Sequence, residues 1–505
     1  MSVLIGLDIG TTGARALAVD ETGAVRADAS VPYPLLTPYP GWAEQRPEDW
    51  WRAAQEALRQ IAAAVRMANG GEIVGLGLTG QMHGAVFLDA ADTVIRPALL
   101  WNDQRTEAQC REITERVGAA RLLAIAGNPA LTGFQAPKIL WLREVEPEHY
   151  ARVAHVVLPK DYIRRLLTGE WATDASDASG TLLLDVRRRD WSPEILDALE
   201  IPRAWLPKVY EGPDVTGRLL PAVADALGLP AGIPVAAGGG DNAAAAVGTG
   251  VITAGIVSAS IGTSGVVFAH ADTFTPDPSG RIHAFCHAVP GAYHLMAVTL
   301  AAGGSFRWWR DVLGGETDDD AYEAMTADAA GVPPGAEGLL FLPYLTGERT
   351  PLLDPFARGV FVGLTARHTR AHLTRAVMEG VTYSLRAGLE IMRELGVSAA
   401  DVRATGGGAR SPLWRQMQAD IFATPVRRTV AEEGPAFGAA LLGGVAAGVW
   451  RDVGAASATV RLRNETDWPD AARSCVYDDY YAVYGSLYPA TRDAMHRLAA
   501  LAESA

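Results

Sequence analysis

The chain has 505 residues, more than one hydrophobic core usually serves, so its length predicts two or more large domains. Hydrophobic residues make up 49% and charged residues 20%, which is the balance of a compact soluble protein and excludes a largely disordered chain. The formal net charge of -14 disfavours nucleic acid and anionic membranes as main partners, because both bind clustered positive surfaces.

The chain begins with a strand-like apolar segment, "VLIGLDIG" at 3–10, which follows Met1 without the basic lead-in and cleavage site of a signal peptide. The sequence contains no run of about 18 uninterrupted apolar residues. Cys110, Cys286 and Cys475 form no CxxC pair, so neither a disulfide framework nor a zinc site is indicated. These features predict a cytoplasmic protein with reduced thiols.

A strand–turn–strand segment occurs twice, as "LIGLDIGTTGARALAVD" at 4–20 and as "IVSASIGTSGVVFAH" at 256–270. Ile9 and Ile261 begin the matching turns, about half a chain apart. The duplication predicts two related α/β domains with a cleft between them. We place the first domain at 1–248 and the second at 249–505.

The turns of this repeat are suited to phosphate. Gly10 and Gly13 allow backbone torsions that other residues resist, so successive N–H groups and the hydroxyls of Thr11 and Thr12 can point at one anion. The second copy supplies the same groups from the other domain: Gly262, Thr263 and Ser264. A single hairpin of this kind is more often only a tight turn, but two copies at domain spacing favour one shared nucleotide.

Asp8 ends the first strand just before its turn, where a carboxylate can hold Mg²⁺ beside phosphates, through water. The second copy has Ser260 at this place, so only one half is expected to organise the metal. The alternative is that Asp8 stabilises the turn.

Strand-like and helix-like segments alternate along the rest of the chain. Strands are predicted at 73–80 and 402–408, helices at 48–65 and 414–422, and a closing helix at 477–503. Four tryptophans of the predicted helices and their surroundings are assigned to the core: Trp50, Trp51, Trp308 and Trp309.

Two common nucleotide-binding patterns are missing. Lys138, Lys160 and Lys208 are the only lysines, and none lies in a GxxxxGK loop, which excludes a P-loop. The HRD and DFG motifs of protein kinases are also missing from the sequence.

Asp241 stands alone in "GGGDNAAAAVG" at 238–248, between glycines and a run of alanines. The glycines let the backbone approach a cleft, and the following residues can form a helix whose N-terminus favours an ionised carboxylate. From spacing alone, a helix N-cap and a catalytic base are equally good interpretations.

A third nucleotide candidate is "TGGGARSPLWRQMQADI" at 405–421, where small residues let the chain pass close to a flat ring before a helix begins. The residues in question are Gly406, Gly407, Gly408 and Ala409. The segment "EEGPAFGAALLG" at 432–443 has small residues suited to tight helix packing, and we assign it a structural role.

Together these motifs resemble the FGGY family of carbohydrate kinases, within the superfamily of sugar kinases, Hsp70 and actin. "GVFVGLTARHTRAHLTRAVME" at 359–379 fits the family's second signature, and "PYLTGERTP" before it is also similar to family sequence. "QMHG" at 81–84, "LLWNDQR" at 99–105 and "LPKDYIRRLLTGEWATDASDASGT" at 158–181 are similar to the xylulokinase branch. One departure is Gln135, where the first signature usually has a small or hydroxyl residue.

The resemblance implies two duplicated ribonuclease-H-like domains and transfer of phosphate from ATP, with Mg²⁺, to the C5 hydroxyl of D-xylulose. It makes Asp241 the catalytic base and implies sugar contacts from a further set: Met82, His83, Asn242, Trp101 and Asp103. Without the resemblance, a His or Trp in such a place is more often a core residue than a ligand contact. Family likeness also makes a homodimer plausible.

Two alternatives stay open. An FGGY kinase for another ketose or polyol shares the phosphate machinery and differs only in the sugar wall. The second alternative is an ATP-driven conformational switch, in which nucleotide controls partner binding. The sequence disfavours it, because it shows no separate substrate-binding domain.

Overall fold

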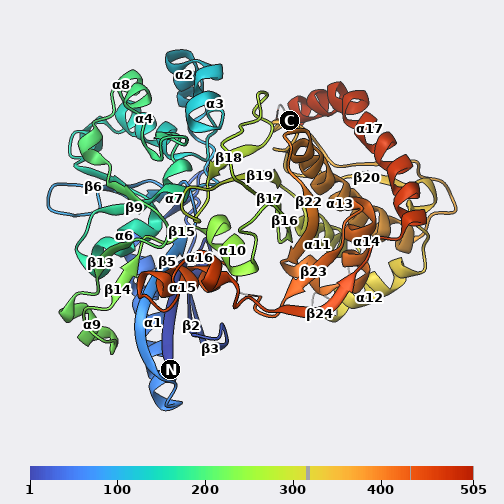
Figure 1. The fold of residues 1–505 in the computed structure, drawn as a ribbon. Helices are drawn as coiled ribbons and strands as arrows, with labels where there is room; N and C mark the ends of the chain where they lie inside the picture. Colours follow the sequence, from blue (N-terminus) through green and yellow to red (C-terminus); the bar gives the residue numbers. More distant parts are fainter. Residues whose placement is uncertain (314–318, 433, 504–505) are drawn as a thin grey trace.

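The computed structural model describes residues 1–313, 319–432 and 434–503. Figure 1 shows two lobes side by side, each built on a mixed β-sheet with helices packed on it. No helix among the described residues is both long enough and apolar enough to cross a membrane.

The first sheet joins segments from the start and the middle of the chain. Strands β1 and β2 are antiparallel, as are β2 and β3, whereas β5 runs parallel to β1 and to β14. In spatial order the strands are β3 (Val25–Pro32), β2 (Gly13–Asp20), β1 (Ser2–Ile9), β5 (Glu72–Gly80), β14 (Pro234–Ala236) and β13 (Val215–Arg218), with β15 (Gly239–Gly240) beside the end of β5.

The second sheet repeats this plan. Its strands β19 (Tyr293–Thr299), β17 (Gly265–Ala271), β16 (Gly255–Ile261), β22 (Ala399–Thr405) and β23 (Val426–Thr429) follow in space with the same directions, between β18 (His283–Cys286) and β24 (Leu462–Asp467). The order of three antiparallel strands followed by two parallel ones confirms the duplicated ribonuclease-H-like fold predicted from the repeat.

The strand register also matches between the two copies. Asp8 lies opposite Thr79 on β5, and Ser260 lies opposite Thr405 on β22. The structure therefore confirms that Asp8 and Ser260 occupy equivalent places at the ends of equivalent strands.

Predicted and observed elements agree best where a regular spacing of apolar residues continues over many positions. Helix α1 (Pro47–Met67) covers the predicted 48–65, with Pro47 in its first turn and Arg66 in its last. Helix α14 (Pro412–Phe422) begins at the Ser411 cap. Strand β22 ends at Thr405, before Gly406, because that glycine has a φ of 76° that no strand contains.

The remaining elements cover the sheets and the outer edges of both lobes. In the first lobe these are α2 (Glu107–Val117), α3 (Ala119–Ala126), α4 (Gln135–Val145), α5 (Pro147–Tyr150), α6 (Pro159–Thr168), α7 (Ala175–Ser179), α8 (Pro193–Leu199), α9 (Pro221–Leu227) and the short strands β4 (Glu44–Gln45), β6 (Val86–Leu88), β7 (Ala98–Leu99), β8 (His155–Val157), β9 (Ala172–Asp174), β10 (Leu184–Asp185), β11 (Asp190–Trp191) and β12 (Lys208–Tyr210). In the second they are α11 (Gly303–Val312), α12 (Asp319–Ala330), α13 (Arg370–Glu394), α17 (Ala471–Glu503), β20 (Leu340–Leu342) and β21 (Val360–Val362).

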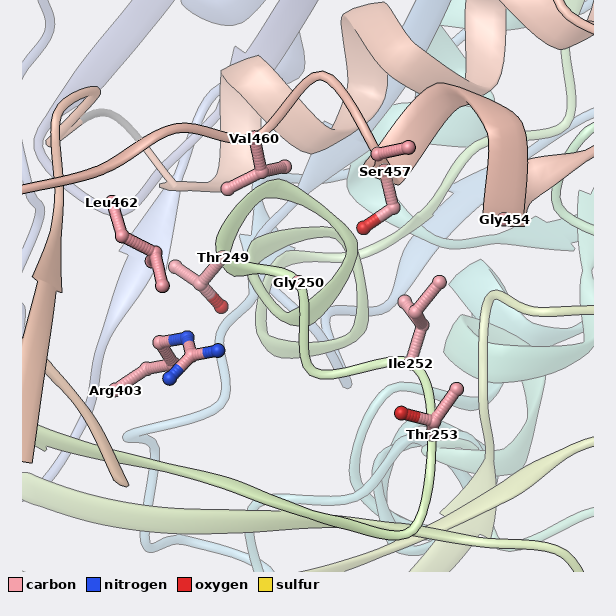
Figure 2. Close-up of a pocket in the computed structure, with 10 residues that line it drawn as sticks. Thr249, Gly250, Ile252, Thr253, Arg403, Gly454, Ser457, Val460 and Leu462 are labelled. Atoms are coloured by element: carbon pink, nitrogen blue, oxygen red, sulfur yellow. The ribbon is translucent and has the colours of Figure 1, made fainter. Parts of the chain in front are cut away.

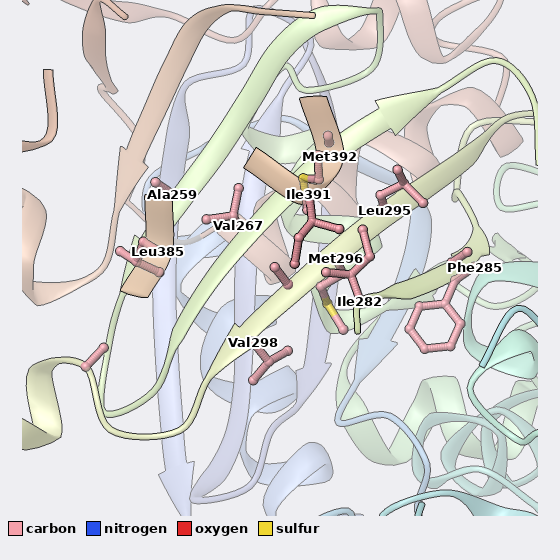
Figure 3. Close-up of a cluster of buried hydrophobic side chains, with 14 of the residues drawn as sticks. Ala259, Val267, Ile282, Phe285, Leu295, Met296, Val298, Leu385, Ile391 and Met392 are labelled. Carbon is pink, nitrogen blue, oxygen red and sulfur yellow. The ribbon is translucent and has the colours of Figure 1, made fainter. Parts of the chain in front are cut away.

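The core of the second lobe lies between its sheet and α13. Figure 3 shows side chains of the strands, among them Val267 and Met296, packed against Leu385 and Met392 of that helix, and all four are buried. Such burial is the main favourable contribution to folding.

The chain crosses between the lobes three times. It leaves the first lobe after α10 (Asp241–Thr249), returns before α15 (Gly434–Ala446), and leaves again between α16 (Val453–Ser457) and β24. The predicted domain division at residue 248 falls in the last turn of α10, whereas α15 and α16 pack against the first lobe.

Helix α15 packs very closely on β1, β5 and α10. A Cβ added to Gly6 would lie 1.8 Å from Ala436 O, and one added to Gly438 would lie 1.8 Å from Ala244 O, so only glycine fits. This confirms the structural role predicted for 432–443, of which residue 433 lies outside the described part.

The prediction that all four tryptophans are core residues is wrong for one of them. Trp50 is fully buried, Trp309 is nearly so, and Trp51 is half-buried against the same core as Trp50, but Trp308 is 37% exposed. Neighbouring residues of a helix point about 100° apart, so Trp308 and Trp309 cannot both face α13, where Trp309 Nε1 donates to Thr374 Oγ1.

Candidate active site

The candidate site lies at one edge of the first sheet, where parallel strands end together. Strands β1, β5 and β15 run in the same direction, with Ile9 and Gly240 both opposite Gly80 on β5. The residues at or just after the ends of these strands therefore meet: Asp8, Met82, His83, Asp241 and Asn242. The sequence could place these residues after strands, but only the strand order brings them to one edge.

Asp241 is the first residue of α10, and Gly240 occupies the N-cap position without a side-chain cap. The N-cap interpretation of Asp241 is therefore wrong. Its Oδ1 accepts hydrogen bonds from Asn242 N at 2.7 Å and from Asn242 Nδ2 at 2.9 Å. These bonds fix the carboxylate and leave Oδ2 without a hydrogen bond to the described residues.

Asp8 and Asp241 are close enough to affect each other's ionisation. Burial raises the pKa of Asp241 to about 6. Burial, together with the charge of Asp241, raises the pKa of Asp8 to about 7, although Arg15 acts in the opposite direction. Two carboxylates in a partly desolvated site resist being charged together unless a cation or a proton compensates them.

A divalent cation fits at Asp8. Its Oδ1 is buried without a hydrogen-bond partner, and a carboxylate oxygen is the kind of ligand that Mg²⁺ prefers. The described residues contain no cluster of three or more His, Cys, Asp or Glu that could hold a metal by itself. Mg²⁺ usually takes one or two carboxylates together with water and phosphate oxygens, so this donor set suffices.

A fully buried cluster of charged residues holds the backbone next to Asp241 in place. Gly240 N donates to Ser176 Oγ at 3.1 Å, and Ser176 Oγ donates to Asp174 Oδ1 at 2.5 Å. Lys160 Nζ lies 2.9 Å from Asp174 Oδ2, 2.7 Å from Asp161 Oδ1 and 3.3 Å from the Asp177 carboxylate. The sequence shows this segment only as similar to the family, because a lysine followed by three aspartates along a chain does not reveal that all four are buried together.

His83 is held in a conformation that few side chains adopt, with a φ of 69°. Its Nδ1 lies 2.6 Å from Gly180 O, and since a carbonyl only accepts, Nδ1 carries the proton and Nε2 is left as an acceptor. Burial lowers the pKa of His83 to about 3, so the imidazole is neutral. Met82 is buried beside Gly240 and Gly180, whose added Cβ atoms would lie 2.9 and 3.0 Å from it.

The two residues from "WNDQR" lie in different surroundings. Trp101 Nε1 donates to Thr11 Oγ1 at 3.0 Å, so it is tied to the first phosphate turn. Asp103 is fully buried, accepts from Ala43 N at 2.7 Å and forms an ion pair with Arg105 at 2.6 Å. Its carboxylate therefore has partners within the protein, and its charge also acts on Lys138, whose Nζ donates to His83 O at 2.9 Å.

Gln135, the departure from the family signature, is also buried. Its Nε2 donates to Gly84 O at 2.9 Å and to Val157 O at 3.2 Å. It thereby anchors the backbone directly after His83, which a small or hydroxyl side chain could not reach.

The two turns predicted to bind phosphate are both closed by a backbone hydrogen bond, but the first has one residue more between its paired strands. Gly10 N donates to Gly13 O at 3.1 Å, and Gly262 N donates to Ser264 O at 3.0 Å. Helix α11 starts against the second turn, where Gly303 N donates to Gly262 O at 2.8 Å. Thr263 Oγ1 also accepts from Arg307 at 2.7 Å, which adds a positive charge there.

The loop 405–410 packs against the second turn. A Cβ on Gly406 would lie 2.6 Å from Ile261 O, and one on Gly408 would lie 2.6 Å from the Ile261 side chain. A cavity of about 260 Å³ is lined by this loop and by Arg15 of the first lobe. Three of the four residues predicted to bind nucleotide in this loop line the cavity: Gly406, Gly407 and Ala409. Gly408 instead faces the Ile261 side chain.

Arg349 of the second lobe approaches the same region, and sequence reasoning missed it. Its Nη2 lies 4.0 Å from the position that a Cβ on Gly133 would take, and its charge contributes to lowering the pKa of His83. The neighbouring Glu348 is buried, which raises its pKa to about 8, so Glu348 does not neutralise Arg349. The guanidinium makes no ion pair with the described residues, so it can bind ligand oxygens.

Comparison with known proteins shows the family of the chain. Models of the FGGY carbohydrate kinase family match its N-terminal domain at 3–248 and its C-terminal domain at 257–447. The xylulose kinase of Escherichia coli K12 is 42% identical over 96% of this chain and 98% of its own, and that of Lactococcus lactis is 41% identical over 99% of both. The crystal structure of xylulose kinase from Rhodospirillum rubrum superposes with a TM-score of 0.91 at 33% identity, covering 98% of this chain and all of the other. The chain belongs to the FGGY family of carbohydrate kinases.

Proposed function

We propose that the protein transfers the γ-phosphoryl group of ATP to the C5 hydroxyl of D-xylulose and so forms D-xylulose 5-phosphate. The observation that carries this proposal is the meeting of Asp8, His83 and Asp241 at one sheet edge. Full-length relatives named xylulose kinase supply the identity of the sugar.

The nucleotide would lie between the two phosphate turns, with adenosine against the 405–410 loop. Backbone N–H groups of both turns and Thr12 suit the phosphates. Mg²⁺, held by Asp8 through water or directly, would neutralise charge on the β- and γ-phosphates. Closure of the lobes would shield the γ-phosphate from water.

Asp241 would orient the sugar hydroxyl and accept its proton through Oδ2. A pKa of about 6 leaves it mostly ionised near neutral pH and a better base than an ordinary aspartate. Because transfer of a phosphoryl group is largely dissociative, positioning accounts for much of the contribution. The Asn242 bonds to Oδ1 hold the carboxylate in one orientation.

The sugar would lie between Met82 and His83 of the first lobe and Arg349 of the second. The free Nε2 of His83 can accept from a sugar hydroxyl, the Arg349 guanidinium can donate to sugar oxygens, and Trp101 offers an apolar surface near Thr11. The role of Asp103 as a sugar ligand stays a prediction, and its buried ion pair favours a structural role. A homodimer and a cytoplasmic location also stay predictions.

A sugar panel tests the proposal directly. Phosphorylation is measured with D-xylulose, D-ribulose, L-ribulose, xylitol and glycerol at equal concentrations. D-Xylulose is expected to give the highest kcat/KM. A higher value for another substrate would favour the second candidate, an FGGY kinase for that ketose or polyol, and turnover of none would favour an ATP-driven switch.

The acidic limb of the pH profile is expected near the pKa of Asp241. Burial raises that pKa above its ordinary value, so the base is lost by protonation as the pH falls through about 6. We therefore expect kcat/KM for the sugar to fall about tenfold per pH unit below that value. A profile that stays level down to about pH 4.5 would show that Asp241 is not the titrating base.

Replacing His83 by Ala is expected to raise the KM for sugar by about fivefold and to leave the KM for ATP nearly unchanged. The change removes one neutral acceptor from the sugar side of the cleft, worth about 1 kcal/mol. His149→Ala, at a half-exposed histidine paired with Glu146, is the control. If His83→Ala changed only the KM for ATP, His83 would lie on the nucleotide side of the cleft and not on the sugar side.

A further inference from the structure

A second cavity, of about 270 Å³, lies at the hinge between the lobes, away from the cleft that holds the candidate site. Figure 2 shows its walls: the end of α10 at Thr249 and Gly250, the following residues to Thr253, α16 at Ser457, and Arg403 of β22. Two of the three chain crossings, after α10 and after α16, thus line one pocket. Its volume exceeds the space that a few water molecules need.

Arg403 is the charged group of this hinge pocket. Its side chain comes from the second sheet, is 6% exposed as a residue, and points toward Thr249 in Figure 2. Its Nε has no acceptor among the described residues, whereas its Nη1 forms an ion pair with Asp401 Oδ2 at 2.5 Å. Buried donors of a charged group without acceptors are costly, and native proteins usually satisfy them with water or an ion.

The local charge is not balanced. Asp401 is shared between Arg403 and Arg427, so two guanidinium groups face one carboxylate. Of the ten lining residues, all of them described, Arg403 is the only charged one. The hinge pocket therefore carries a net positive charge, which disfavours a cation and favours an anion.

The other polar groups of the hinge pocket narrow the kind of anion that can bind. Thr249 Oγ1 and Ser457 Oγ already donate to backbone carbonyls of α10, at 2.8 Å to Ala245 O and 3.4 Å to Val247 O, so the donors left for a ligand are Arg403 and the Thr253 hydroxyl. A pocket that presents a guanidinium and a hydroxyl suits the oxygens of phosphate. The C-terminal end of α10 opposes an anion, so the affinity is expected to be modest.

We propose that the hinge pocket binds a small phosphate-type anion, either inorganic phosphate or a compact phosphomonoester, on the Arg403 guanidinium. The bound anion would link β22 of the second lobe to the residues that join α10 to β16. It would thereby favour one angle between the lobes, at the far end of the helix whose first residue is Asp241. Any ligand that changes this angle would then change the anion affinity, and the reverse.

Calorimetry with the full chain tests this proposal. Inorganic phosphate is titrated at constant ionic strength in the presence of saturating ADP, so that nucleotide fills the phosphate turns. A parallel titration with glycerol 2-phosphate distinguishes a phosphomonoester from free phosphate. We expect binding of at least one of the two, with Arg403→Gln weakening it tenfold or more and Asp401→Asn, which removes the competing carboxylate, strengthening it.

The control is Arg451→Gln, which removes a charge of the same kind from an arginine side chain that is 85% exposed and does not line the pocket. It should leave the dissociation constant unchanged within about twofold. Equal binding by Arg403→Gln and the native chain, or no binding of either anion, would overturn the proposal and leave a pocket that holds only water.

If Arg403→Gln fails to fold, a crystal of the native chain soaked in phosphate decides the question. Tetrahedral density bonded to Arg403 supports the proposal, and water alone overturns it. Hydrogen exchange provides a second readout, since phosphate should slow exchange at 249–254 and 458–461 in the native chain and not in Arg403→Lys, whose point charge cannot make the same paired bonds.

Discussion

Replacing Asp241 by Asn is expected to lower kcat for sugar phosphorylation by about 10² or more, while ATP affinity stays nearly unchanged. The amide keeps the size of the side chain and can still accept from Asn242, but it cannot take the proton of the sugar hydroxyl. Removal of a general base typically costs 10² to 10⁴ in rate. Single-turnover phosphorylation and calorimetric titration with ATP measure the two effects separately.

Asp177→Asn is the matched control for that experiment. Asp177 belongs to the buried cluster behind Asp241, next to Lys160, and burial raises its pKa well above the ordinary value. The same substitution there should change kcat by less than about threefold. If both variants lose activity equally, the loss reflects disruption of the cluster and not removal of a base.

Replacing Lys160 by Met is expected to reduce the free energy of unfolding by about 3 to 5 kcal/mol, the usual cost of leaving buried charges without their partner. Lys160 is fully buried and lies against three aspartates. Although burial lowers it, the carboxylates raise the pKa of Lys160 well above its usual range, so it stays charged. Denaturation by urea measures the loss.

The Lys160 substitution should also lower kcat, because Gly240 is held through Ser176 and Asp174. Lys208→Met provides the control at an exposed lysine that lies over the Tyr210 ring, where a change within about 0.5 kcal/mol is expected. A loss below about 1 kcal/mol for Lys160→Met would mean that the cluster does not depend on this charge.

The sequence predicts the fold well because the same strand–turn–strand segment occurs in both halves of the chain. The matching turns at Gly10 and Gly262 imply matching strand order, and the register of Asp8 and Ser260 confirms it. Residues that follow strands directly, such as His83 and Asp241, could be proposed as site residues for the same reason.

Other features depend on contacts between distant segments, which no local pattern encodes. Lys160 and Arg349 reach the site only through tertiary packing, and α15 returns to the first lobe after most of the second has been built. The contacts of Asp103 are a further example: its motif resembles a sugar-binding segment, and only the structure shows that its carboxylate contacts Arg105 and Ala43 N.

The most direct test of the account is a crystal structure of the protein with D-xylulose and a non-hydrolysable ATP analogue. We expect the triphosphate between the turns at Gly10 and Gly262, and the C5 hydroxyl of the sugar within hydrogen-bond distance of Asp241 Oδ2. Nucleotide bound elsewhere, or an Asp241 carboxylate turned away from the sugar, would contradict it.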